Sequence, residues 1–164
     1  INVSPQETAV AMNLTVYENL DFMANVYQIE NKKDKIDNLI KTFKLEEVLK
    51  QKAKTLSGGY MRKLSIAISL INDPKILFLD EPTLGLDVLS RKELWNTINT
   101  LKGKITIILT THYMEEAESL SDRVAIMNKG NIIEIGTPKE IISKTKTKNM
   151  EDAFVSLITG GKDE

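Results

Sequence analysis

The sequence predicts an α/β protein that combines a mostly parallel sheet, its crossover helices and a helical subdomain. Strand-like and helix-like segments alternate from Lys75 onward, which is typical of a parallel sheet. Residues 76–79 are continuously apolar, as expected for a strand that is covered on both faces. Upstream, residues 15–54 carry apolar side chains at helical spacing, which predicts a small helical unit.

The composition fits one globular domain and excludes several classes of protein. The chain has 164 residues, 41% of them hydrophobic, so it can bury a core. A net charge of -1 gives no overall attraction to nucleic acid, and the lack of cysteine excludes disulfides and cysteine-based metal sites. No apolar run approaches the roughly 20 residues that span a bilayer, and no signal peptide is visible. Because the first residue is Ile1 and not Met, we expect a piece of a longer protein.

Three helices are predicted in the first half of the chain. Thr15 and Glu18 form a capping box that begins the first helix, and a polar loop at residues 30–35 separates it from the second. Ser57 can cap the third helix, which ends before Asp73-Pro74 because the residue before proline avoids helical geometry. The apolar faces of the second and third helices are formed by Ile36, Leu39, Ile40 and Phe43, and by Leu64, Ala67, Ile68 and Ile71.

The second half contains the remaining core elements. In order, we expect a helix that begins at Asp87, a buried strand at 105–111, a short helix at 114–120, a hairpin of strands 124–127 and 132–135, a helix that begins at the Thr137 capping box, a polar linker at 144–148 and a last helix at 150–158. The predicted elements divide the chain into residues 1–8 (the end of a strand and the loop after it), 9–72 (a helical subdomain), 73–143 (alternating strands and helices) and 144–164 (a linker and C-terminal helix).

Polar side chains stand where the two buried strands end. Asp80 and Glu81 follow the first strand, while Thr111 and His112 close the second. Because ligands of open parallel sheets bind beyond the carboxyl ends of the strands, we expect both ends to face one crevice. Of the two carboxylates, one can hold a hard cation such as Mg²⁺ and the other can orient or deprotonate a water, while the histidine can bind a phosphate oxygen or that water. Alternatively, the acidic pair is a solvated loop and the histidine is structural.

Ser57-Gly58-Gly59 precedes the third helix and has two interpretations. A helix N-terminus presents unpaired N–H groups and the positive end of the helix dipole, and glycines let a phosphate approach the backbone closely. The serine hydroxyl adds a further donor. The other interpretation is an ordinary N-cap after a flexible turn.

Taken in order, these motifs resemble the ATP-binding cassette (ABC) ATPases over nearly the whole chain. Leu56-Ser57-Gly58-Gly59 opens a helix, and 76–83 reads Ile-Leu-Phe-Leu-Asp-Glu-Pro-Thr. Gly85-Leu86-Asp87 and Thr110-Thr111-His112 follow at the family's spacing. The resemblance implies part of a P-loop NTPase core of the ABC type, together with the family's helical subdomain. It also implies binding of ATP and Mg²⁺.

The resemblance assigns a role to each matching residue. Asp80 corresponds to the Walker B aspartate that acts on Mg²⁺, Glu81 to the general base, and His112 to the histidine that contacts the γ-phosphate. Gln6 corresponds to the glutamine of the loop that touches both Mg²⁺ and the transport partner. Ser57, Gly58 and Gly59 match the signature motif, which closes on nucleotide held by the opposite subunit of a dimer, and Asp87 matches the loop that crosses that dimer interface.

The sequence departs from the family pattern in two places. Tyr60 stands where the signature motif commonly has glutamine, a variation that its serine and backbone contacts tolerate. The phosphate cradle Gly-x-x-x-x-Gly-Lys-Ser/Thr does not occur, because Gly103-Lys104 and Gly161-Lys162 precede neither serine nor threonine. The resemblance places this cradle, and the aromatic residue that stacks on adenine, upstream of Gln6. We therefore expect a C-terminal fragment that lacks half of the nucleotide site and is inactive alone.

The resemblance also places one strand of the family's sheet in the segment upstream of Ile1. Losing that strand would expose unpaired backbone and apolar surface. We therefore predict that the isolated chain pairs with another copy or exchanges elements with it, and a monodisperse, well-folded monomer would contradict this.

The segments around Gln6, at residues 13–20 and at 151–154 resemble bacterial exporters of drugs, sodium or polysaccharide. In these, a soluble ATPase dimer on the cytoplasmic face of the membrane works with a separate permease, contacted near Gln6 and the helical subdomain. One alternative is a soluble ABC ATPase that acts on ribosomes or DNA. Another is a non-catalytic remnant of such an ATPase that only docks partner proteins. The short segment between Gln6 and Leu56 leaves no room for a long coiled-coil insertion, which favours transport without a nucleic-acid partner.

Overall fold

The computed structural model describes residues 1–160 and divides into two compact units, Ile1–Thr110 and Thr111–Glu164. Residues 161–164, which include the Gly161-Lys162 pair, lie outside the described residues. The four-segment division made from the sequence stays a prediction. None of the helices in residues 1–160 is long and apolar enough to cross a membrane.

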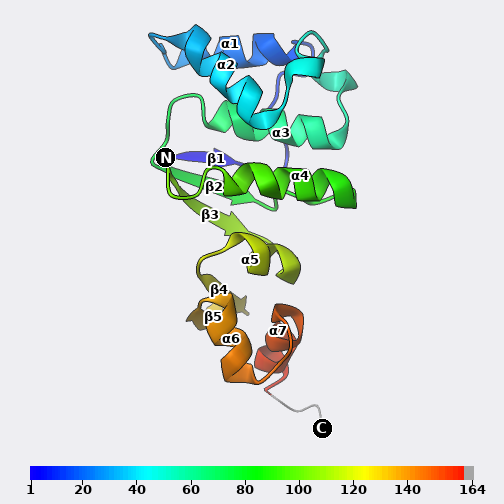
Figure 1. The fold of residues 1–164 in the computed structure, drawn as a ribbon, viewed down its shortest axis with the longest axis vertical. Helices are drawn as coiled ribbons and strands as arrows, with labels where there is room; N and C mark the ends of the chain where they lie inside the picture. Colours follow the sequence, from blue (N-terminus) through cyan, green and yellow to red (C-terminus); the bar gives the residue numbers. More distant parts are fainter. Residues whose placement is uncertain (161–164) are drawn as a thin grey trace. The chain divides into compact units, whose positions relative to one another are not determined.

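The first unit is built on a parallel sheet of three strands in the order β1-β2-β3 (Figure 1). The strands are β1 (Asn2–Ser4), β2 (Ile76–Asp80) and β3 (Thr106–Thr110). Ser4 lies opposite Leu79, and Asp80 lies opposite Thr110, so all three strands end near the same edge of the sheet. The predicted parallel sheet is therefore confirmed.

The predictions that β2 is covered on both faces and that β3 is a buried strand were wrong. In β2, Leu77 and Leu79 are buried while Phe78 is only partly so, and in β3 Ile108 is 43% exposed. Val3, Phe78 and Ile108 are direct cross-strand neighbours, so they lie in a row on one open face of the sheet. The reason is that residues 1–110 provide helices to cover one face, while β3 forms an edge of the sheet within the described residues.

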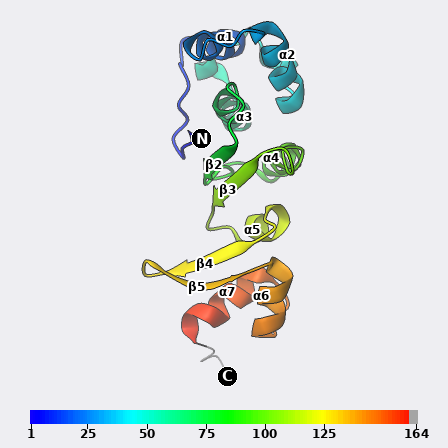
Figure 2. The ribbon, with the colours of Figure 1, turned by 90° about the vertical axis from the view of Figure 1, so that its left-hand side faces the viewer.

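Three α-helices form the helical subdomain beside the sheet (Figures 1 and 2). They are α1 (Val16–Val26), α2 (Lys32–Phe43) and α3 (Gly58–Ser69), with short 3₁₀ segments η1 (Glu46–Val48) and η2 (Ala53–Thr55) before α3. The Thr15 capping box is present as predicted, with both of its reciprocal hydrogen bonds. The loop before α2 is shorter than predicted, since the helix begins at Lys32.

Helix α3 lies at the centre of the first unit. It contacts α1 and α2 on one side and β1 on the other. Every residue from Arg62 to Ile71 is consequently buried, and not only the single apolar face that was predicted. Asn2 ties β1 to this helix by donating from Nδ2 to the Ser69 carbonyl at 2.7 Å. Helix α4 (Val88–Asn99) packs against α3 and buries Leu94, Trp95 and Ile98.

The second unit has its own small core. It contains α5 (Met114–Leu120), an antiparallel hairpin of β4 (Val124–Asn128) and β5 (Asn131–Gly136), α6 (Pro138–Thr145) and α7 (Met150–Thr159). Ile126, Ile141, Met150 and Ala153 form the buried cluster between the hairpin and the last two helices. The hairpin turn is Lys129-Gly130, both at positive φ, which matches the predicted turn signal.

Candidate functional site

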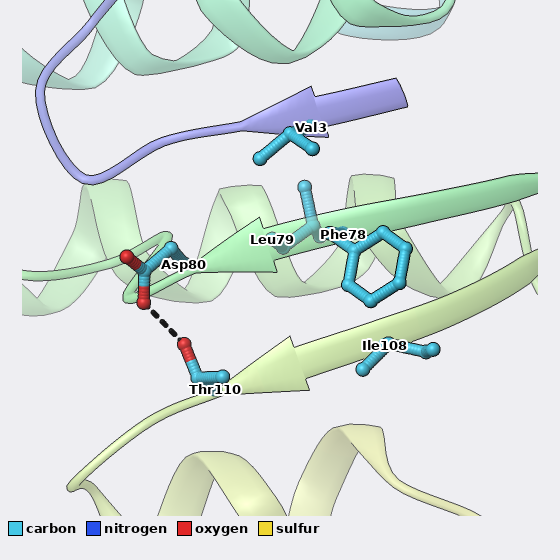
Figure 3. A pocket seen from close by; sticks show the side chains of 6 residues that line it. All are labelled: Val3, Phe78, Leu79, Asp80, Ile108 and Thr110. Atoms are coloured by element: carbon cyan, nitrogen blue, oxygen red, sulfur yellow. Dashed lines mark hydrogen bonds between the residues drawn. The ribbon is translucent and has the colours of Figure 1, made fainter. Parts of the chain in front are cut away.

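Asp80 ends β2 on the open face of the sheet, beside an apolar hollow. The hollow has a volume of about 380 Å³ and is lined by Val3, Phe78, Leu79, Asp80, Ile108 and Thr110. Figure 3 shows the Asp80 carboxylate at the end of this hollow, where it accepts a hydrogen bond from the Thr110 hydroxyl. The carboxylate is exposed. A hard cation or a phosphate-bound cation can therefore reach it from the open face.

Glu81 has an unusual backbone. Its φ of 43° lies in the left-handed region, which costs a non-glycine residue about 1–2 kcal/mol. Its N–H donates to the Thr110 carbonyl at 3.0 Å, and its own carbonyl accepts from the Leu84 N–H at 3.2 Å and from Arg62 at 2.6 Å. The surrounding hydrogen bonds hold this conformation in place, a pattern found at functional sites.

Arg62, which the sequence analysis did not single out, holds this end of the sheet together. It lies on α3, is only 5% exposed, and donates from its guanidinium to five backbone carbonyls at distances between 2.6 and 3.2 Å. These carbonyls belong to Pro5, Gln6, Asp80, Glu81 and Pro82. Arg62 therefore joins the loop after β1 to the loop after β2.

Gln6 lies in the loop that follows β1, where its side chain is exposed. Its carbonyl is one of the Arg62 acceptors, at 3.2 Å. Ser4, two residues earlier, is buried and its Oγ lies 3.3 Å from that of Ser65 on α3. The loop is thus anchored at its main chain while the glutamine side chain stays accessible.

Ser57 is the N-cap of α3, as predicted, and accepts from the Tyr60 N–H at 3.4 Å. The two glycines that follow differ in their surroundings. A Cβ on Gly59 would lie 3.0 Å from the Ser90 Oγ, whereas one on Gly58 would meet only Leu86, at 3.6 Å. Gly59 therefore has a packing role within this chain, since it lets α3 and α4 approach closely.

Asp87 is the N-cap of α4, and accepts from the N–H groups of Leu89 at 3.0 Å and Ser90 at 3.1 Å. Hydrogen bonds from the side chain and backbone of Ser90, and then from Leu89, lower the pKa of the Asp87 carboxyl. Asp87 is exposed, and the α4 residue next to it in space, Ser90, faces Gly59. The starts of α3 and α4 consequently lie side by side.

His112 belongs to the second unit, where it precedes α5. It is exposed, and its ring lies against Tyr113 with the centroids 4.3 Å apart. The Thr111 hydroxyl accepts from the Tyr113 N–H at 3.0 Å. The contact between His112 and the two carboxylates therefore stays a prediction.

The first unit holds seven of the eight predicted positions, in two groups, and Gly58 and Gly59 lie beside Ser57 in the second group. The ends of β1 and β2 place Gln6, Asp80 and Glu81 around Arg62, and the adjoining starts of α3 and α4 carry Ser57 and Asp87. Among residues 1–160, no group of three or more acidic or histidine side chains is arranged to hold a metal ion. One carboxylate at the edge of a hollow suits Mg²⁺ that arrives with phosphate oxygens, because Mg²⁺ commonly uses one or two carboxylates plus substrate phosphates.

Comparison with known proteins decides the family. The sequence profile of the ABC transporter family matches residues 1–84, which is half of the chain and includes β1, α3 and the Asp80-Glu81 strand end. The chain belongs to the ABC transporter family. ATP-binding domains of this family bind ATP and generally act as ATPases, and they generally dimerise and associate with membrane components.

Relatives of this ABC chain include several transporter proteins. It is 35% identical over 167 residues to the linearmycin resistance ATP-binding protein LnrL of Bacillus subtilis, covering 100% of this chain and 52% of LnrL. It is 37% identical over 161 residues to the probable multidrug ABC transporter ATP-binding protein YbhF of Escherichia coli, covering 93% of this chain and 28% of YbhF. It is 41% identical over 134 residues to human phospholipid-transporting ATPase ABCA3, covering 80% of this chain and 8% of ABCA3.

A solved ATP-binding subunit of an ABC transporter shares the fold. It matches with a TM-score of 0.79 and 26% identity, covering 96% of this chain and 68% of that subunit. The ABC chain thus spans about half the length of LnrL and smaller shares of YbhF and ABCA3.

Arg62 was missed from the sequence, and Thr110 was named only as part of the Thr110-Thr111-His112 motif, without its contact to Asp80. Arg62 stands in a helix among residues that are mostly apolar, and a buried arginine in such a run is a signal that could have been used. Its acceptors are backbone carbonyls, which no side-chain motif reveals. Thr110 faces Asp80 only because β2 and β3 pair in this register.

Proposed function

We propose that the protein containing this chain is the ATP-hydrolysing subunit of an ABC exporter. The observation that carries the proposal is the end of β2, where Asp80 and Glu81 meet the ends of β1 and β3 and are fixed by Thr110 and Arg62. This is the edge of a parallel sheet at which ligands bind. Adjacent carboxylates there suit a reaction that needs both charge neutralisation and a base.

Hydrolysis is proposed to proceed by in-line attack of water on the γ-phosphate of ATP. Glu81 would orient the water and accept its proton, and Asp80 would hold the metal ion from the open face of the sheet. Mg²⁺, when bound, supplies charge neutralisation of the phosphate oxygens. Gln6 and His112 would contact the metal and the γ-phosphate, respectively.

We propose that the phosphate cradle comes from a segment outside this sequence. The motif Gly-x-x-x-x-Gly-Lys-Ser/Thr does not occur in the 164 residues, and LnrL is about twice as long as the matched region. The signature residues Ser57, Gly58 and Gly59 would act on nucleotide held by a second subunit. The unpaired N–H groups at the start of α3 are the chemical basis for that role.

The partner is proposed to be a membrane permease, and the intact protein is proposed to work at the cytoplasmic face of the membrane. The exposed Gln6 side chain and the adjacent helical subdomain would form the contact with this permease. LnrL and YbhF carry drug resistance or multidrug transport in their names, which supports an exporter of drug-like compounds.

The variant Glu81→Gln tests the proposal in the chain extended upstream through its phosphate cradle. Loss of the general base should lower the rate of ATP hydrolysis about 100-fold or more, since such groups contribute 10²–10⁴-fold. Binding of Mg-ATP should stay close to that of the parent protein, and the closed dimer should accumulate.

Glu47→Gln is the matched control, because Glu47 is an exposed glutamate of the same unit that lies in η1, outside the site. It should hydrolyse ATP at the parent rate. Parent-level hydrolysis by Glu81→Gln would show that Glu81 is not the base.

A further inference from the structure

We infer that Arg62 is a positioning residue that makes the Gln6 loop and the Glu81 backbone move as one unit during ATP hydrolysis. This inference rests on the proposed function and adds a residue to it. The buried Arg62 side chain bridges two loops, each of which carries a residue of the site.

All five N–H groups of the guanidinium are used. Nε donates to the Pro82 carbonyl at 2.8 Å. Nη1 donates to the carbonyls of Pro5 at 2.6 Å and Gln6 at 3.2 Å, and Nη2 donates to those of Asp80 at 2.8 Å and Glu81 at 2.6 Å. Nη1 therefore binds the loop after β1, and Nη2 binds the end of β2 and the loop after it.

This arrangement requires arginine. A buried charge is costly unless it is hydrogen-bonded, and Arg62 is 5% exposed. The planar guanidinium has five donors in a fixed fork, whereas a lysine ammonium has three donors at one point. A lysine at this position can keep the charge but cannot reach both loops with the same geometry.

The position of the contacts explains why they bear on catalysis. Glu81 is held in the left-handed region, and one of the bonds that keeps it there is the bond from Arg62 to its carbonyl. Gln6 is the next residue along from Pro5 in the loop that the proposed permease contacts. A displacement of that loop therefore changes the acceptors of the guanidinium, and with them the backbone that carries the catalytic carboxylate.

The test compares Arg62→Lys and Arg62→Gln with the parent in the protein extended upstream through its cradle. We expect kcat for ATP to fall about 10-fold or more in both variants, while KM changes less than about threefold. Mg-ATP binding stoichiometry, measured on the same samples, corrects for any loss of folded protein. An unchanged kcat in folded Arg62→Lys would overturn the inference.

Lys63→Met is the control for loss of a buried cation from the same helix. Lys63 is also 5% exposed, but its ammonium binds Glu93 on α4 at 2.8 Å, away from both loops. It should keep kcat within about twofold of the parent. If Lys63→Met loses as much kcat as Arg62→Lys, the effect comes from the helix and not from the bridge, and the inference is wrong.

If the Arg62 variants do not fold, hydrogen exchange on the parent protein tests the inference instead. Mg-ATP should slow amide exchange in residues 80–86 and in residues 6–8 together. Protection of residues 80–86 alone would overturn the inference. Failure of the parent to bind or hydrolyse Mg-ATP would instead refute the proposed function, and the inference would fall with it.

Discussion

Glu81 combines a strained backbone with the proposed role of general base. Its left-handed backbone is unfavourable for any residue with a Cβ, yet the Thr110 carbonyl, the Leu84 N–H and Arg62 keep it there. A glycine would adopt this φ without the steric cost. The glutamate therefore occupies a position at which stability alone would select another residue.

A comparison of Glu81→Gly with Glu81→Ala isolates the backbone contribution. Both variants lose the carboxylate, but alanine keeps the Cβ that opposes positive φ. We expect the glycine variant to be equal to the alanine variant or up to about 1 kcal/mol more stable, because the αL penalty exceeds the extra entropy of unfolded glycine. Urea denaturation measures the difference in the free energy of unfolding.

Lys92→Gly and Lys92→Ala are the control substitutions, since Lys92 is exposed in the middle of α4. There glycine should be about 1 kcal/mol less stable than alanine. If glycine is the less stable residue by the same amount at position 81, the left-handed conformation is not a source of strain.

At the scale of single residues, the sequence named the side chains of the candidate site but not how they are held. Asp80 and Glu81 were named from their place at a strand end and Gln6 from the family resemblance, and their roles stay predictions. The positive φ of Glu81 and the five acceptors of Arg62 depend on three segments that are distant in the sequence, at residues 5–6, 62 and 80–82. No local pattern encodes such a contact.

At the scale of elements, the adjoining starts of α3 and α4 give a test of close packing. A Cβ at Gly59 would crowd Ser90, at 3.0 Å from Oγ and 3.2 Å from Cβ, while one at Gly58 has ordinary contacts. We expect Gly59→Ala to lower the free energy of unfolding by about 1 kcal/mol. Overpacking commonly costs about 1–3 kcal/mol, and the higher helix propensity of alanine offsets part of that cost.

Gly58→Ala should be neutral or stabilising by up to about 1 kcal/mol, because it gains helix propensity without a clash. Thermal or urea denaturation of the two variants measures this contrast. Equal effects of the two substitutions would mean that α3 and α4 do not approach as closely as the structure places them.

Helix α4 also has a pH-dependent cap. Hydrogen bonds from Ser90 and Leu89 lower the pKa of Asp87 in the folded state below its unfolded value of about 3.9. A lowered folded pKa means that the stabilisation is fully present above the unfolded pKa and is lost as pH falls through the folded pKa. We expect the stability difference between the parent and Asp87→Ala to be constant from pH 7 to about pH 5 and to shrink below about pH 4.

Urea denaturation across this pH range, with Asp122→Ala as a control for an exposed aspartate outside the helix caps, measures the effect. A difference that grows as the pH falls would contradict the assigned role of Asp87 as a charged cap.

The helix caps and the hairpin were predictable because their signals are local. Thr15, Ser57, Asp87 and Thr137 all cap helices as predicted, and the Lys129-Gly130 turn joins β4 to β5. The burial of the strands was not predictable in this way. An apolar strand such as β3 has the composition of a covered strand, but its burial depends on what packs against it, and here Ile108 faces the open side.

At the scale of the whole chain, we propose that the first unit carries one half of a nucleotide site. Its sheet ends in Asp80 and Glu81, while the open row of Val3, Phe78 and Ile108 adjoins the same hollow. The outer edge of β3 has no strand beside it among the described residues. Pairing of the isolated chain with a second copy stays a prediction, and these features are the surface on which such pairing would be expected.

The most direct test is a calorimetric titration of this 164-residue chain with Mg-ATP, beside the chain extended upstream through its phosphate cradle. We expect no measurable binding to the 164 residues and saturable binding to the extended chain, because the acidic strand end needs the cradle to hold the phosphates. Tight binding of Mg-ATP by the 164 residues alone would show that another surface of the chain holds the phosphates and that the proposed half-site is wrong.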